Sequence, residues 1–101
     1  MWEPLNVTVS GEAAAEQFAK RHAPARKPLF RFLDMVRAAT WKHFPEVKQT
    51  FPATDYSAAT GTLIFDIGGN KYRPIARVDF EEQMLYVQSV MTHEKYHREN
   101  L

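Results

Sequence analysis

The sequence predicts an α+β domain whose N-terminal helices pack on one face of an antiparallel β-sheet. Three observations predict it: helical periodicity confined to the first half, β-branched and aromatic strands in the second, and tight turns between those strands. The expected order of elements is β-α-α-β-β-β-α. With 101 residues, 45% apolar residues and no cysteine, the chain has room for one domain, residues 1–101, held by packing rather than disulfides.

The first half predicts a short strand and two helices. Leu5–Val9 alternate weakly, Ser10 suits a helix N-cap, and residues 12–19 are strong helix formers. A second helix is expected from about Lys27 to about His43, ended by Phe44-Pro45. Its expected buried face, at helical spacing, comprises Leu29, Phe32, Leu33, Val36 and Ala39.

The second half predicts a three-stranded meander after an irregular connection at residues 51–57. The expected strands are Thr62–Ile67, Lys71–Phe80 and Met84–Met91. Gly68-Gly69-Asn70 suits a hairpin turn, because glycine and asparagine accept the positive φ that such turns require. Thr92 can cap a final helix that begins at His93. On the middle strand, Lys71, Arg73 and Arg77 are expected to share the face away from the helices, about 7 Å apart.

Charge is unevenly distributed along a nearly neutral chain. Residues 20–48 contain eight Lys or Arg against two Asp or Glu. Such a segment is typical of a surface that meets polyanions, but a solvated helix face explains it equally well. No signal peptide and no apolar run long enough to span a membrane are visible, so we expect a cytoplasmic protein without a membrane partner.

Two motifs carry a family resemblance. Residues 65–73, Phe-Asp-Ile-Gly-Gly-Asn-Lys-Tyr-Arg, followed by residues 90–93 and Tyr96, resemble the HigB-type toxins of the RelE-like mRNA interferase superfamily. Trp41, Phe44-Pro45 and residues 53–56 fit the same pattern, so the resemblance covers roughly residues 36–97. It implies a compact RelE-like fold and a type II toxin–antitoxin toxin that inhibits translation by cleaving ribosome-bound mRNA. The implied partner is a HigA-type helix-turn-helix antitoxin, through which alone the toxin meets operator DNA.

Metal-independent RNA cleavage needs proton transfer and positive charge around the phosphate. Histidine suits proton transfer near neutrality, so His93 is the expected proton-transfer residue, with Arg73 and Lys71 supplying charge and Tyr96 orienting or donating. No cofactor or metal is expected. Further candidate RNA contacts are Asn70, Arg77, Gln88 and Trp41. Of these, Asn70 also reads as a turn residue and Trp41 as a core residue.

The sequence departs from the family pattern at three positions. Pro74 replaces the usual leucine, His97 the common aspartate, and Gln88 an arginine on the last strand. We expect Gln88 to share a strand face with Tyr86 and Val90 and to lie near Arg73. A neutral residue there predicts weaker catalysis than in relatives, unless Arg77 supplies the charge.

Two rival interpretations stay open. His93-Glu94-Lys95-Tyr96-His97 matches the H-E-x-x-H motif of zinc hydrolases, although no third ligand follows it. A catalytically weak RNA-binding module is the other alternative, favoured by Gln88 and by a sequence pI of only about 8.1.

Overall fold

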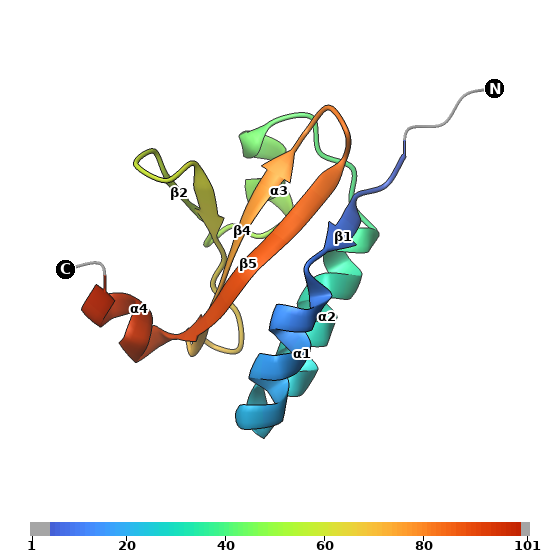
Figure 1. The fold of residues 1–101 in the computed structure, drawn as a ribbon. Helices are drawn as coiled ribbons and strands as arrows, with labels where there is room; N and C mark the ends of the chain where they lie inside the picture. The colour runs from blue at the N-terminus through green and yellow to red at the C-terminus, as the bar shows by residue number, and fades with distance from the viewer. Residues whose placement is uncertain (1–4, 100–101) are drawn as a thin grey trace.

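Five strands form one mixed sheet in the computed structural model, which describes residues 5–99 (Figure 1). In chain order the elements are β1 (Thr8–Ser10), α1 (Glu12–Arg21), a 3-10 turn (Ala23–Ala25), α2 (Arg26–Arg37), α3 (Phe44–Thr50), β2 (Asp55–Ser57), β3 (Thr62–Ile64), β4 (Tyr72–Asp79), β5 (Met84–Thr92) and α4 (His93–Glu99). The sheet order is β1-β5-β4-β3-β2. The predicted α+β class is confirmed, but β1 pairs with β5 in parallel, so the sheet is not purely antiparallel.

The helices α1 and α2 lie together beside the long β4–β5 hairpin, whereas α4 projects from the end of β5 (Figure 1). Four residues of the predicted α2 stripe are buried, namely Leu29, Phe32, Leu33 and Val36. The Phe32 ring packs on the Phe65 ring with centroids 4.8 Å apart, which joins α2 to the sheet. No helix within residues 5–99 has the length and apolarity needed to cross a membrane.

The start of α1 differs from the prediction. Ser10 is the last residue of β1, and Gly11 is the N-cap, with φ of 80° and no side-chain hydrogen bond. A Cβ at Gly11 would lie 2.4 Å from the Val87 carbonyl oxygen, because the chain crosses β5 closely at this point. Glycine is therefore required for two reasons, its conformation and its size.

The predicted second helix is wrong in length, and the structure contains a further helix. Helix α2 ends at Arg37, and the Ala39 carbonyl then accepts a hydrogen bond from the Val7 amide instead of continuing the helical pattern. Phe44-Pro45 begins α3 rather than ending α2. Proline is tolerated in a first helical turn because its missing N–H has no intrahelical acceptor there, so its position alone did not distinguish a start from an end.

The strand predicted at residues 62–67 is much shorter than expected, and Pro74 explains why. The Phe65 amide donates to the Pro74 carbonyl at 2.9 Å, but Pro74 has no N–H to return the bond. The β3–β4 ladder ends with the Ile64–Ile75 pair, one residue earlier. Asp66 consequently lies outside the ladder, next to β4. On the other edge, β2 forms within the segment predicted to be irregular.

A β-bulge in β5 changes which side chains face the helices. Ile75 pairs with Ser89, but the next residue of β4, Ala76, pairs with Val87, so Gln88 is the extra residue. Val87 is buried on the core side, and Val90 also packs against the core. The expectation that Tyr86, Gln88 and Val90 share one face is therefore wrong.

Candidate functional site

The glycine-rich hairpin before β4 is closed by its own backbone. The Ile67 amide donates to the Tyr72 carbonyl at 3.1 Å, and the Lys71 and Tyr72 amides both donate to the Ile67 carbonyl. Asn70 has a φ of 73°, as the sequence predicted for this turn. The turn places the Asn70 side chain beside the first residues of β4.

Arg73 lies at the centre of a polar cluster, which we call the Arg73 cluster and define as Asp66, Asn70, Arg73 and His93. The guanidinium donates from Nη1 to Asp66 Oδ1 at 2.9 Å, and from Nη2 to Asn70 Oδ1 at 2.6 Å and to His93 Nδ1 at 2.8 Å. Nη1 also reaches the Tyr72 carbonyl at 3.3 Å. Arg73 is only 8% exposed, so its charge is held inside the protein and balanced by Asp66.

The hydrogen bond from Arg73 fixes the form of the His93 ring. A guanidinium has donors and no acceptor, so Nδ1 of His93 must accept, and the proton of the neutral ring is then on Nε2. The His93 backbone is fixed as well, because its amide donates to the Lys71 carbonyl at 2.8 Å. Thr92 Oγ1 accepts from the Lys95 amide at 3.2 Å, which confirms the predicted cap of the final helix.

Asp66 is the member of this cluster that sequence reasoning missed. It belongs to the motif at residues 65–73, but an acidic residue has no evident part in binding a phosphate. It lies seven residues before Arg73 in the chain and opposite Arg73 in the sheet, between the Ile64–Ile75 pair and the Ile67–Tyr72 bridge. An acid seven residues before a buried arginine is the only signal the sequence offered.

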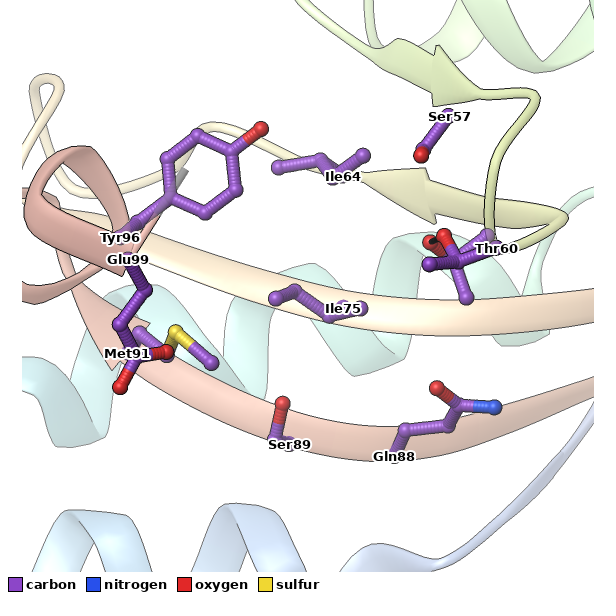
Figure 2. Close-up of a pocket in the computed structure, with 10 residues that line it drawn as sticks. Ser57, Thr60, Ile64, Ile75, Gln88, Ser89, Met91, Tyr96 and Glu99 are labelled. Carbon is purple, nitrogen blue, oxygen red and sulfur yellow. Dashed lines mark hydrogen bonds between the residues drawn. The ribbon is translucent and has the colours of Figure 1, made fainter. Parts of the chain in front are cut away.

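The remaining predicted residues lie around α4 and on the face of the sheet that α1 and α2 do not cover. Lys71 is exposed in the turn directly before β4. Tyr96 of α4 and Gln88 of the bulge line one hollow of about 290 Å³, at opposite ends of it (Figure 2). The hollow is lined by hydroxyl, apolar and amide side chains with Glu99 as its one charged residue. We call it the Gln88 hollow.

Two expectations about these residues are wrong. Arg73 pairs with Met91 in the sheet, so the register does not set Gln88 opposite Arg73. Arg73 is buried, and Arg77 donates to the Thr60 carbonyl at 2.6 Å, so with Lys71 they do not form a row of solvated cations.

Trp41 has no surface on which a base could stack. Its side chain is 1% exposed, and its Nε1 donates to Thr50 Oγ1 at 3.1 Å. The Gln83 side chain, in the β4–β5 turn, accepts from the Trp41 amide and donates to the Trp41 carbonyl. Trp41 is thus a core residue that ties α2 and α3 to the sheet, and it is removed from the candidate RNA contacts.

The geometry does not favour the zinc interpretation. The His93 and His97 rings stack with centroids 6.0 Å apart on a helix of seven residues. Nδ1 of His93 already accepts from a cation, and residues 5–99 contain no group of three or more His, Asp or Glu side chains placed to hold a metal ion.

A helix-backed sheet with a polar cluster at one end of its central strand is consistent with the RelE-like fold. The HigB toxin family, described as the RelE-like toxic component of a toxin–antitoxin system, matches residues 25–99, and the chain belongs to this family. The mRNA interferase toxin HigB of Escherichia coli K12 is 28% identical over 86 residues, which cover 84% of this chain and 83% of that protein. The mRNA interferase HigB of Shigella flexneri matches to the same extent. Membership of a toxin–antitoxin family implies a cognate antitoxin.

Proposed function

We propose that this protein is a metal-independent endoribonuclease that cleaves mRNA on the ribosome and thereby inhibits translation in the cytoplasm. We further propose that a HigA-type helix-turn-helix antitoxin neutralises it. The observation that carries the proposal is the 2.8 Å hydrogen bond from Arg73 Nη2 to His93 Nδ1, within the motif shared with the family. The relatives named as mRNA interferases support the reaction class.

The reaction is a transesterification within the RNA. The 2′-oxygen forms a bond to the adjacent phosphorus, the bond from phosphorus to the 5′-oxygen breaks, and a 2′,3′-cyclic phosphate remains. One proton leaves the 2′-hydroxyl and one is added to the departing 5′-oxygen. Charge on the pentacoordinate phosphorane must be stabilised, which fixed cationic donors do well in a site that excludes water.

Arg73 and His93 would act together in this reaction. The acceptors of Arg73 Nη2, Asn70 and His93, are both exposed residues, so Nη2 is the part of the guanidinium that an incoming phosphate can reach by displacing them. A phosphate oxygen accepts more strongly from a guanidinium than a neutral imidazole does. Once Arg73 binds the phosphate, Nδ1 of His93 is released, and the ring can exchange protons with the reacting oxygens.

Three other residues complete the proposed site. Lys71 adds a second cation at the mouth of the cluster. Asn70, once released from Arg73, can hydrogen-bond the RNA. Tyr96, from the side of α4 that lines the Gln88 hollow, can orient the nucleotide next to the scissile bond.

The test compares two histidines of α4 in a cleavage assay with mRNA and ribosomes, with and without EDTA. His93→Gln should lower the cleavage rate by about 10²–10⁴, the usual contribution of a general acid or base. His97→Gln is the matched control and should cleave at the wild-type rate, and EDTA should have no effect. Loss of cleavage in both variants, with stoichiometric zinc in the purified protein, would show the zinc hydrolase instead.

A second candidate is an RNA-binding module with little catalysis. Two observations favour it: the charge of Arg73 is balanced internally by Asp66, and Gln88 brings no charge to its hollow. Gln88→Arg should raise cleavage if the site is an enzyme short of one cation, because the phosphorane gains more from a cation than the ground state does. Tyr86→Arg adds the same charge on β5 outside the hollow and should change nothing. If wild type and Gln88→Arg are both inert on ribosomes, the module is the correct function.

A further inference from the structure

A second hollow, on the other side of α4 from the Gln88 hollow, has three cations among its lining residues. It lies between the C-terminal end of α1 and α4 and has a volume of about 290 Å³. We call it the basic hollow and define it by Arg21, His22, Lys95 and Arg98, which line it together with Phe18 and residues 90–92. No acidic side chain lines it. The two pairs of basic residues are more than 70 positions apart, so charge counting along the sequence did not reveal their convergence.

Two of the three cations in the basic hollow have no ion-pair partner within residues 5–99. Neither Arg21 nor Arg98 forms an ion pair with any residue between 5 and 99. Lys95 has one acidic neighbour, Glu99, at 4.0 Å, the longest separation that still counts as an ion pair, and both side chains are about half exposed. The His22 ring stacks on Phe18 with centroids 4.3 Å apart, which fixes one wall of the hollow.

The basic hollow adjoins the proposed catalytic residues. Thr92, which lines it, directly precedes His93, and Arg98 also lines the small hollow formed by His93, Glu94 and His97. By contrast, the Gln88 hollow contains no cation. Around α4 the positive charge therefore lies on one side only, whereas the Gln88 hollow has hydroxyl, amide and apolar groups and the carboxylate of Glu99.

We propose that the basic hollow is a phosphate-binding subsite for the RNA backbone beside the scissile bond. An RNA strand bound at His93 carries phosphates on both sides of the reacting one, and Arg73 can serve only one of them. Arg21, Lys95 and Arg98 are the cations placed to bind the next phosphates, by charge and without reading sequence. The inference rests on the proposed function and adds to it the direction in which the strand leaves the site.

The experiment measures binding of a short fluorescein-labelled 2′-O-methyl RNA, which lacks the attacking hydroxyl and cannot be cleaved. Dissociation constants are measured by anisotropy at several salt concentrations for wild type and for the Arg21→Gln/Arg98→Gln double variant. Each phosphate contact on a single strand contributes about 0.7 to the slope of log K against log salt. The double variant should bind more weakly, with a slope smaller by about 1.4, which is two such contacts.

The matched control is Lys42→Gln/Lys48→Gln. It removes the same charge from exposed positions in or just before α3, which lies at the far end of the molecule from α4 (Figure 1). Its slope should equal that of wild type. Equal loss of slope in both double variants would reduce the effect to net charge and overturn the subsite, and so would an unchanged slope in Arg21→Gln/Arg98→Gln.

Failure of the subsite and failure of the proposed function are distinguishable. If wild type cleaves mRNA but the slopes are identical, the endonuclease stands and the subsite is wrong. If wild type does not cleave while the slopes differ as expected, the subsite stands as part of an RNA-binding module. Absence of binding by wild type would overturn both. Thermal unfolding of each variant checks that the exposed substitutions leave the fold intact.

Discussion

Arg73 shows how one residue can be both structural and functional. Its guanidinium connects the hairpin turn, the segment after β3 and the start of α4 through three side chains. A buried guanidinium without a counter-ion is costly, and Asp66 supplies the balancing charge. The same carboxylate holds the orientation of the guanidinium, and with it the direction in which Nη2 points. Asp66 is therefore a positioning residue for Arg73 in the proposed reaction.

We expect Asp66→Asn to impair both stability and turnover. Asparagine keeps an acceptor oxygen but leaves Arg73 without its counter-ion, which should lower the free energy of unfolding by about 1–3 kcal/mol. A displaced Arg73 guanidinium should lower kcat by about 10- to 100-fold with a smaller change in KM for RNA. Denaturant unfolding and steady-state cleavage measure the two effects.

Asp55→Asn is the control for this variant, because Asp55 is exposed on β2 and has no ion pair within residues 5–99. A purely structural Asp66 would give lower stability with unchanged kcat for the folded fraction. That result would remove the positioning role.

At the scale of elements, β4 is an unusual central strand because it contains a proline with neighbours on both sides. Pro74 pairs with Val90 on β5 and accepts from Phe65 on the other side. The cost is one missing ladder bond, and the regular β3–β4 ladder stops there. Pairing resumes in the same register at the Ile67–Tyr72 bridge, which keeps Asp66 opposite Arg73.

Pro74→Leu should lengthen β3 and leave the site in place. Leucine restores an N–H that can donate to the Phe65 carbonyl, which should add about 0.5–1.5 kcal/mol of hydrogen-bond stabilisation. Ile67 already bridges to Tyr72 in the register of the β3–β4 ladder, so a continuous ladder keeps Asp66 opposite Arg73, and cleavage should stay at the wild-type rate. NMR hydrogen exchange would detect a newly protected amide at position 74. Absence of that protection would show that Pro74 does not interrupt the ladder, and a loss of cleavage would show that the site requires the interruption.

Sequence patterns predicted correctly the features that depend on residues close together in the chain. The α2 stripe, the Gly68-Gly69-Asn70 turn, the β4–β5 hairpin and the Thr92 cap are set by neighbours within a few residues, and the structure confirms them. What failed depends on long-range contacts. The end of α2 is set by Val7 pairing with Ala39. The sequence left open whether Trp41 is a core residue or an RNA contact, and its place in the core involves Gln83, more than forty residues away.

The residues of the candidate site also divide into those that the sequence predicted and those that depend on long-range contacts. The motif residues Asn70, Arg73 and His93 were named from sequence and meet in space. Asp66 and the basic hollow were missed, because one depends on the register between two strands and the other on two helices meeting. A single bulged residue also reversed the expected facing of half of β5.

At the scale of the whole molecule, β1 and α1 join the sheet at a point where the backbone at Gly11 crosses close to β5. The chain enters along β1, parallel to β5, and turns at Gly11 into α1, which packs on the same strand. Any side chain at Gly11 would meet the Val87 carbonyl. The close approach lets α1 cover the sheet and brings Phe18, Arg21 and His22 to the end of β5.

Two glycine variants separate the energetic cost of a strained backbone conformation from the cost of a steric clash. Gly69→Ala places a side chain at φ of 66° with nothing within 4 Å, so it should cost about 1–2 kcal/mol from backbone conformation alone. Gly11→Ala has the same conformational cost at φ of 80° and adds the clash with Val87, typically a further 1–3 kcal/mol or so. Denaturant unfolding measures both. Equal losses would mean that the crossing at Val87 relaxes freely.

The bulge at Gln88 acts on side-chain alternation as a one-nucleotide insertion acts on a reading frame. Gln88 and Ser89 line the same hollow although they are consecutive. Each later residue of β5 therefore faces the side opposite to the one that simple alternation predicts. A deletion of Gln88 is therefore a different experiment from any substitution there. It would remove the bulge, because Val87 faces the core, Ser89 the hollow and Val90 the core again, so the shortened strand alternates regularly and keeps His93 on its present side. One residue inserted between Ser89 and Val90 would instead turn Val90 out of the core, so the number of residues between the bulge and His93 is as much a determinant of the site as the histidine itself.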